Sequence, residues 1–452
     1  MRHYFLKIVV LLVAVIAFSC SSEKDDILKQ PNIIFIMTDD HGYGELGCYG
    51  NLDIETPNID KLAENGVRFT NFYANAPICS PTRAAFLTGR YQQRIGLDDA
   101  LHYQEMGRGL PIEGRTIGND LQSKGYDCGL FGKWHVGYDY DRRPLQQGFN
   151  DFFGILGGNH HYFDHMDRIG VHDLWLGNDS INRKGYTTDL ITDEALRFIE
   201  KNRSSPFFLF LSHLAPHFPY LGPNDQDKVV KPKHKSWQKE GNPETYIEMV
   251  ESVDATVGRI LQKISELNLS NRTLIVFTSD NGGAHYAPYV SNGALRGYKG
   301  DLFEGGIRVP CIAQWKGVLP KGETSDQVAI TMDWTSTFLR LAGVDSNKYE
   351  EDGIDLMPIL KRHEKEVERT LFWRRIDGPI RNIPTEYRAV RSGDWKLIEE
   401  IDSPKQYLYN LKLDQSESNN LINNEPEIVK ELNSKLNDWE KSVNNDAEFY
   451  NN

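Results

Sequence analysis

The chain has 452 residues, of which 39% are hydrophobic and 11% aromatic, so it can bury a large core and is expected to form two domains. Its 51 basic and 64 acidic residues give a formal net charge of −13. This charge argues against binding nucleic acid or an anionic membrane through the general surface, and no nucleic-acid partner is expected. An anionic substrate would therefore need a local positive pocket.

The first twenty residues are typical of an export signal. Arg2 and Lys7 precede an unbroken apolar run over 8–18, which is too short to span a bilayer but fits a signal peptide. The small residues before Cys20 resemble a bacterial lipoprotein cleavage site. We predict that residues 1–20 form a lipoprotein-type signal cleaved before Cys20. The protein would then be exported and lipid-anchored to the membrane, in the periplasm or at the outer-membrane surface of a Gram-negative bacterium; cleavage of an ordinary signal is the alternative.

Short apolar runs alternate with helical stretches over the rest of the chain. Five runs bounded by polar residues, Gly or Pro are predicted as buried parallel strands: 32–37, 126–131, 207–211, 274–278 and 309–314. Helices are predicted at 58–65, 187–202 and 244–267. This alternation is typical of an α/β fold with a mostly parallel, helix-covered sheet. Ligands bind beyond the carboxyl ends of the strands in such folds, so the residues after each strand are the candidates for a site.

Acidic and amide side chains follow the first and fourth predicted strands. Asp39 and Asp40 come after the first strand, and Asp280 and Asn281 after the fourth. Adjacent carboxylates repel each other unless a cation neutralises them, and oxygen ligands suit a hard ion such as calcium or magnesium. Helix capping and turn formation explain most such residues in proteins, but two groups at matching strand ends favour a metal site.

Cationic and imidazole side chains follow the second and third predicted strands. Lys133 and His135 come after the second strand, and His217 lies between two prolines after the third. A single histidine in a loop is more often structural than catalytic. Two strand-end histidines and a lysine beside a metal site favour acid–base chemistry instead.

A cysteine lies at the predicted start of a helix. Pro81 suits the first turn of this helix and Gly89 its end, which places Cys79 at a helix N-terminus. The partial positive charge there favours an anion such as sulfate or phosphate. The residues by themselves indicate a cysteine nucleophile beside a metal and several cations, with a small buried thiol as the alternative.

The segment from Cys79 resembles the signature of the formylglycine-dependent (type I) sulfatases, which include the bacterial carbohydrate sulfatases of the alkaline phosphatase superfamily. It reads Cys-x-Pro-x-Arg followed by Ala-Ala-x-Leu-Thr-Gly-Arg. Further matches are Gly-Lys-Trp-His at 132–135, Ser-Asp-Asn-Gly-Gly at 279–283, Arg-Gly-Tyr-Lys at 296–299 and Trp-Lys-Leu at 395–397. One departure is Thr82, where serine is usual, and we expect slower or equal maturation rather than none.

The resemblance implies an alkaline-phosphatase-like catalytic domain over 31–360, with a mostly parallel, helix-covered sheet. It also implies a smaller C-terminal subdomain over 366–452, with an antiparallel sheet and a terminal helix. One Ca²⁺ ion would be bound by Asp39, Asp40, Cys79, Asp280 and Asn281. Position 79 would first be converted to 3-oxoalanine (formylglycine) by a formylglycine-generating maturation enzyme.

The resemblance further implies hydrolysis of a sulfate ester through a covalent sulfated formylglycine intermediate. Arg83 and Lys133 would hold the nucleophile and the sulfate oxygens. Lys299 and His217 would contact sulfate and protonate the departing sugar oxygen, and His135 would take the proton whose loss collapses the intermediate.

The implied substrate is a sulfated saccharide, of galactose type or derived from a glycosaminoglycan. His160, His161 and His165 lie in a segment dense in hydrogen-bonding and aromatic groups, and Arg374 could reach over from the second domain. These four residues are predicted to bind the sugar, with ordinary loop packing as the alternative. Two other functions stay open: a phosphatase or phosphodiesterase of the same superfamily, and a non-catalytic protein that binds sulfated glycans.

Overall fold

The computed structural model describes residues 30–451 except 103–104, 229–236, 238–240, 346–350, 363 and 377–385. The predicted signal and its cysteine at position 20 lie outside the described residues. Among the helices of this described part, none combines the length and the hydropathy that crossing a bilayer requires.

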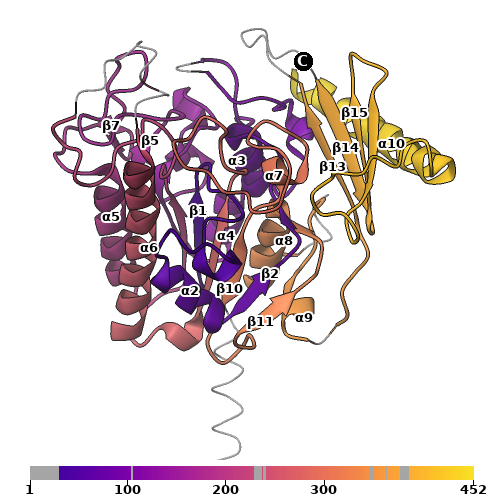
Figure 1. The fold of residues 1–452 in the computed structure, drawn as a ribbon. Helices are drawn as coiled ribbons and strands as arrows, with labels where there is room; N and C mark the ends of the chain where they lie inside the picture. Colours follow the sequence, from indigo (N-terminus) through magenta and orange to yellow (C-terminus); the bar gives the residue numbers. More distant parts are fainter. Residues whose placement is uncertain are drawn as a thin grey trace, which may run out of the picture.

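A ten-stranded sheet forms the centre of the molecule, in the order β11-β2-β10-β9-β1-β8-β4-β5-β6-β7 (Figure 1). Its middle strands are parallel: β9 (Thr273–Ser279), β1 (Asn32–Thr38), β8 (Phe207–Ser212), β4 (Asp127–Lys133) and β5 (Asp151–Ile155). The other strands are β11 (Glu323–Ser325), β2 (Val67–Phe69), β10 (Cys311–Gln314), β6 (Trp175–Leu176) and β7 (Asp179–Ser180). The middle strands are almost entirely buried because helices cover both faces of the sheet.

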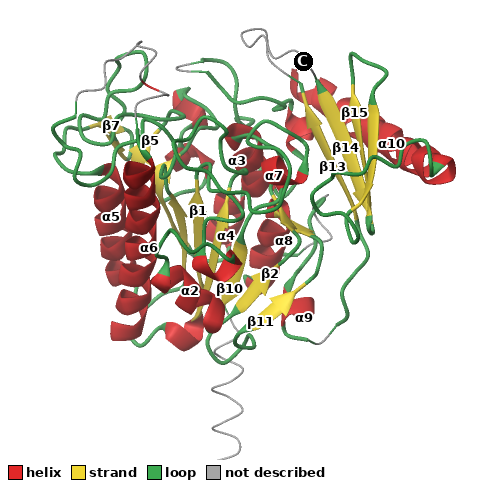
Figure 2. Cartoon of the chain, viewed as in Figure 1, coloured by secondary structure: helices red, strands yellow, loops and turns green. Residues whose placement is uncertain are grey.

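Helices flank the sheet on both faces (Figure 2). One face is covered by α2 (Pro57–Glu64), α5 (Thr187–Lys201) and α6 (Pro243–Glu266), and the other by α3 (Cys79–Thr88), α4 (Ile117–Ser123) and α8 (Thr331–Leu341). Alternate side chains of β1 enter the two layers. Phe35 stacks on Phe86 of α3 with ring centroids 4.1 Å apart, whereas Ile34 belongs to the same buried cluster as Val250 of α6.

The fifth predicted strand runs in the opposite direction to the prediction. Residues of the run 309–314 form β10, which pairs antiparallel with β9 and with β2. The connection after β9 returns to the end of the sheet that it left. The N–H of Gly282, just after β9, donates to the carbonyl of Gly306, just before β10, at 3.0 Å. A parallel strand would need a crossover to the other end. The short helix α7 (Glu304–Ile307) does not provide one.

A second, four-stranded antiparallel sheet packs beside the large one. It consists of β13 (Thr370–Arg375), β14 (Tyr387–Ser392), β15 (Trp395–Glu400) and β16 (Gln406–Asn410), in that order. The C-terminal helix α10 (Pro426–Asn451) buries Leu432, Leu436 and Trp439 in the same cluster as Trp373 and Leu397 of this sheet. The predicted fold class, a mostly parallel helix-covered sheet with a smaller antiparallel sheet and a terminal helix, is therefore confirmed.

The remaining elements are short. They are β3 (Phe72–Tyr73) paired with β12 (Ala329–Ile330), α9 (Met357–Leu360), and 3-10 helices at Gly47–Tyr49, Gln92–Ile95, Tyr140–Arg142, Pro144–Gln147 and Ser270–Arg272.

Candidate active site

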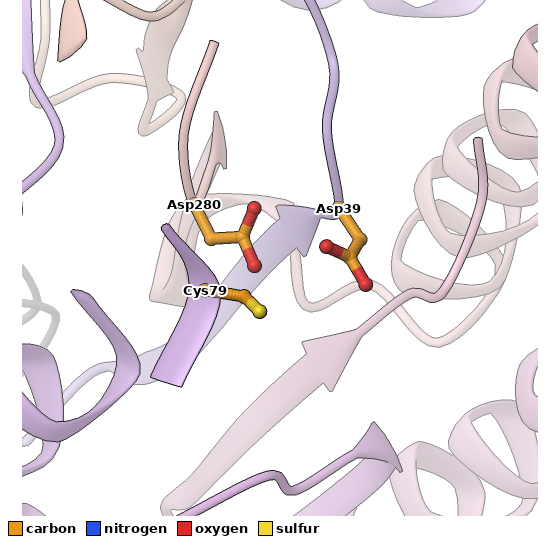
Figure 3. Close-up of side chains that lie close together, drawn as sticks. All are labelled: Asp39, Cys79 and Asp280. Atoms are coloured by element: carbon orange, nitrogen blue, oxygen red, sulfur yellow. The ribbon is translucent and has the colours of Figure 1, made fainter. Parts of the chain in front are cut away.

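Three acidic or thiol side chains point toward one another at the carboxyl edge of the large sheet (Figure 3). Asp39 follows β1, Asp280 follows β9, and Cys79 is the first residue of α3. One potential ligand atom from each lies within 4.8 Å of the others. Asp39 also forms a second such group with Asp40 and His217. The chain thus gathers its predicted metal-binding side chains at one point.

The oxygen atoms of this cluster fit a hard cation. Asp39 Oδ1, Asp40 Oδ2 and Asn281 Oδ1 are buried and have no hydrogen-bond partner among the described residues. A buried acceptor without a partner costs free energy, and a calcium ion would supply what each of these oxygen atoms lacks. Asp40 also adopts a left-handed backbone conformation, with φ of 64°, which places strain at this position. The donor set is therefore suited to calcium.

Each carboxylate of the cluster already has one fixed cationic partner. The pairs are Lys133 Nζ with Asp39 at 2.6 Å, Arg83 Nη2 with Asp280 at 2.7 Å and Lys299 Nζ with Asp40 at 2.6 Å. Although burial lowers the pKa of Lys299, the Asp40 carboxylate beside it raises that pKa well above its usual value. Three cations thus balance three anions, so a bound dication would leave the site positive toward a sulfate group.

The ring of His135 faces Cys79. Its Nδ1 lies 3.3 Å from the sulfur, and its Nε2 lies 3.0 Å from the carbonyl oxygen of Leu101. Because a carbonyl only accepts, Nε2 carries the proton, and Nδ1 of the neutral ring presents a lone pair to position 79. Burial, and then the charge of Lys133, lower the pKa of His135 well below its usual value. The ring is thus held in the form of a base.

His217 approaches the cluster from the loop after β8. Its Nδ1 donates to the carbonyl of Phe218 at 2.8 Å, and its Nε2 lies 3.7 Å from Asp40 Oδ2. Burial, and then the charge of Lys299, lower the pKa of His217 well below its usual value, although the Asp40 carboxylate opposes this shift. The free nitrogen of this ring therefore points into the site.

Thr82 keeps the hydroxyl group of the serine that the family usually has at this position. Its Oγ1 donates to the carbonyl of Ala76 and accepts from the N–H of Ala76, both at 3.0 Å. The hydroxyl thus fastens the segment before Cys79 to the first turn of α3. Serine would offer the same oxygen, so the added methyl group leaves this pair of hydrogen bonds in place.

The cluster opens into a pocket of about 350 Å³. Cys79, His135, His217 and Lys299 lie in its wall, so four of the predicted catalytic residues are brought together there. The wall also contains Asn159, from the segment predicted to bind the sugar, and four residues that the sequence did not single out: His102, Tyr138, Arg168 and Tyr286. Nothing in the sequence around Arg168 distinguishes it from a surface arginine.

The three predicted sugar-binding histidines do not line the pocket, which corrects that expectation. Both ring nitrogens of His160 are engaged inside the protein, with Asp173 O at 2.9 Å and Thr187 Oγ1 at 2.8 Å. His161 Nδ1 accepts two backbone N–H groups of its own loop at 3.3 Å, and the ring of His165 packs 5.2 Å from that of His160. These histidines hold the loop in place.

Arg374 also lies outside the pocket wall, contrary to the prediction. Its Nε and Nη2 donate to Asp98 at 3.0 and 2.8 Å, and its Nη1 donates to Asn444 of α10 at 2.7 Å. Each of the three guanidinium nitrogens thus donates a hydrogen bond inside the protein. These bonds join β13 and α10 to the segment that leads to Ala100 and Leu101. The residue therefore supports one wall of the pocket from behind.

The sheet, its covering helices and the acidic cluster at the strand ends define a hydrolase of the alkaline phosphatase-like superfamily. A family model described as Sulfatase matches residues 31–344, and one described as N-sulphoglucosamine sulphohydrolase, C-terminal, matches 298–442. The chain belongs to the sulfatase family and is a sulfuric ester hydrolase.

Individual relatives agree with this assignment. N-acetylgalactosamine-6-sulfatase of Sus scrofa is 34% identical over 391 residues, covering 80% of this chain and 72% of that protein. Steryl-sulfatase of Homo sapiens is 33% identical over 420 residues, covering 74% and 70%. The solved structure of Ps i-CgsB in complex with k-i-k-neocarrahexaose has a TM-score of 0.81 at 31% identity, and the match covers 91% of this chain and 93% of that one.

Proposed function

We propose that this sulfatase removes a sulfate ester from a carbohydrate, of galactose type or derived from a glycosaminoglycan, through a covalent sulfated formylglycine intermediate at position 79. The observation that carries the proposal is the meeting of Cys79, three carboxylates and three cations at one end of a pocket. The similarity to an N-acetylgalactosamine-6-sulfatase and to a structure bound to k-i-k-neocarrahexaose supports a saccharide substrate.

The ligands of the proposed calcium ion would be Asp39, Asp40, Asp280, Asn281 and the oxidised residue 79. Calcium would supply positive charge that activates a hydroxyl group of residue 79 and stabilises the sulfate oxygens. Arg83 is fixed by Asp280 through two nitrogens, at 2.7 and 3.0 Å, so it contributes its charge without moving. Lys133 is fully buried and contributes in the same way.

The two histidines would divide the proton transfers. His217 would protonate the departing sugar oxygen, because its Nε2 lies on the pocket side and an anionic sulfate nearby would raise its pKa from the lowered value. His135 would accept the proton that residue 79 loses when sulfate is released, since its Nδ1 already faces that position. Each ring is oriented by a backbone carbonyl, which fixes the nitrogen that acts.

The earlier alternatives have less support. A phosphoryl-transfer enzyme with two metal ions would need a second set of ligands, and the other candidate cluster within the described residues shares Asp39 with the first. A protein that only binds sulfated glycans would not need a base held against a potential nucleophile. Membership of the sulfatase family also favours hydrolysis of sulfate esters.

The proposal is tested with the full chain, co-produced with a formylglycine-generating enzyme and assayed on defined sulfated monosaccharides and matched phosphate esters. We expect calcium-dependent sulfate release from at least one sugar and no release by the Cys79→Ala variant. Faster release of phosphate than of sulfate from matched esters would contradict the proposal.

We also propose export with a lipid anchor at Cys20. The short apolar run over 8–18 and the small residues before this cysteine support it. Metabolic labelling with a fatty acid should label the wild type and leave the Cys20→Ser variant unlabelled. An unlabelled wild type in its native host would contradict the anchor.

A further inference from the structure

We propose that the pocket contains a second anion-binding subsite centred on Arg168, so that the preferred substrate carries another negative charge besides the sulfate that is removed. The inference rests on the proposed function, because it takes the reacting sulfate to lie at Cys79. The two residues line the same pocket of about 350 Å³, whose volume is in the range of small-molecule sites.

Arg168 is the cation of the pocket wall that no carboxylate neutralises. It is half-buried, and within the part of the chain that the structure describes its guanidinium has no hydrogen-bond or ion-pair partner. Lys299, by contrast, is paired with Asp40 at 2.6 Å. A guanidinium presents a planar fork of donors that matches a carboxylate or a sulfate, so an unpaired one in a pocket wall is suited to an anion.

The composition of the wall favours an anion as well. Among the described residues, no aspartate or glutamate lines the pocket, although the chain carries a net charge of −13. Besides Arg168 and Lys299, the wall contains the histidines at 102, 135 and 217. Arg168 therefore adds positive charge to a wall that contains no carboxylate, while Lys299 is paired and the rings of His135 and His217 are neutral.

The backbone places Asn159 next to Arg168. An antiparallel bridge joins His160 to Asp167, so residues 159 and 168 lie opposite each other at the next position along the two segments, and both line the pocket. Asp167 holds the turn, because its Oδ1 accepts the N–H groups of Ile169 at 3.0 Å and of Val171 at 2.8 Å. The fixed turn thus holds Arg168 in the pocket wall, which lowers the entropy cost of binding an anion there.

The anion could be a second sulfate or the carboxylate of a uronic acid, since a guanidinium binds both. The test compares kcat/KM of the mature enzyme for three substrates: a monosulfated neutral sugar, the same sugar with a second sulfate, and the same monosulfated sugar linked to a uronic acid. We expect the wild type to prefer one of the two dianionic substrates, which identifies the anion.

The variant Arg168→Gln should lower that preference, measured as the ratio of kcat/KM for the dianionic over the monoanionic substrate, by about tenfold or more. The matched control is Arg203→Gln, which removes the same charge from a side chain that is 58% exposed and paired with Glu200. This control should leave the ratio unchanged. A ratio within about twofold of the wild type in Arg168→Gln, or an active wild type that hydrolyses neither dianion faster than the monosulfated sugar, would overturn the inference.

A binding measurement separates this inference from the proposed function. The Cys79→Ala protein, with calcium present, is titrated calorimetrically with the same three sugars, alone and combined with Arg168→Gln. Tighter binding of a dianionic sugar that depends on Arg168 supports the subsite even if the wild type hydrolyses no sulfate ester, an outcome that would refute only the proposed function. Equal affinities with and without Arg168 would refute the subsite whatever the hydrolysis assay gives.

Discussion

His135 and His217 are distinguished by the ring nitrogen that each one leaves available. The Nε2–H of His135 donates a hydrogen bond to the carbonyl of Leu101, which leaves the unprotonated Nδ1 facing Cys79. The Nδ1–H of His217 donates a hydrogen bond to the carbonyl of Phe218, which leaves Nε2 facing Asp40. These two backbone contacts fix which ring nitrogen each histidine offers, and the proposed acid role of His217 further requires that its Nε2 gain a proton when an anionic sulfate binds.

The acid role of His217 predicts a dependence on the leaving group. An activated aryl sulfate leaves without a proton, whereas a sugar alkoxide does not, so His217→Ala should slow sugar sulfates about 10²-fold or more and aryl sulfates far less. Steady-state kcat/KM on both substrates measures the difference. The exposed His285, changed to alanine, should alter neither value. Equal slowing of both substrates by His217→Ala would contradict the acid role.

The sequence placed the residues that directly follow the strands better than those in the loop after β5. Residues that directly follow a buried strand have their position fixed by the sheet, which is why Asp39, Lys133 and Asp280 could be placed together. His160 and Arg168 lie in a long loop after β5, where residue type does not indicate direction. The loop uses the histidine rings to hold itself together, and the arginine faces the pocket instead.

At the scale of elements, the helices predicted at 58–65, 187–202 and 244–267 lie within one residue of α2, α5 and α6. The start of α6 has a chemical marker. Pro243 is the first residue of α6, and the Asn242 side chain before it accepts the N–H of Thr245 at 2.8 Å. The direction of β10 has no such marker, since an apolar run indicates burial but not whether a strand is parallel. The prediction of a parallel strand was wrong for this reason.

A buried charge cluster joins the two sheets. Lys396 of β15 is fully buried and contacts Glu304 of α7 at 2.8 Å and Glu417 at 2.9 Å. Burial by itself would raise the pKa of Glu304, but Lys396 and Arg308 lower it to about 2. The lysine therefore keeps Glu304 ionised where the small sheet meets the large domain, whereas burial raises the pKa of Glu417 to about 7 although Lys396 lowers it.

Replacing Lys396 with methionine should destabilise the protein by about 3–5 kcal/mol, because two buried carboxylates lose their shared cation. Without the lysine the lowered pKa of Glu304 rises and the already raised pKa of Glu417 rises further. A carboxyl group whose folded-state pKa is raised reduces the stability of the protein as the pH increases. The loss should thus be larger at pH 7 than at pH 5, as measured by denaturant unfolding. Lys412→Met, at a side chain that is 74% exposed, should have little effect. A variant Lys396→Met as stable as the wild type would contradict this account.

For the whole molecule, the proposed calcium ion connects β1, β9 and α3 at one point. The three internal ion pairs already balance the cluster, so we expect the protein without calcium to remain folded but to be less stable. Calcium at about 100 times its dissociation constant would add about 2.7 kcal/mol. The unfolding midpoint should accordingly rise with calcium concentration.

Thermal unfolding with calcium and with a chelator measures this effect. Asp39→Asn should abolish most of the calcium dependence, whereas Asp402→Asn, at an exposed position, should keep it. An unfolding midpoint that does not change with calcium in the wild type would mean that the unpartnered oxygens at the strand ends do not bind the ion.

The central claim is that residue 79 acts as an oxidised side chain. Peptide mass spectrometry of active enzyme purified from its native host tests this most directly. The account predicts that the peptide containing position 79 has the mass of an aldehyde in place of the thiol, in a fraction that rises and falls with specific activity. Full activity in protein whose Cys79 is an unmodified thiol would contradict it.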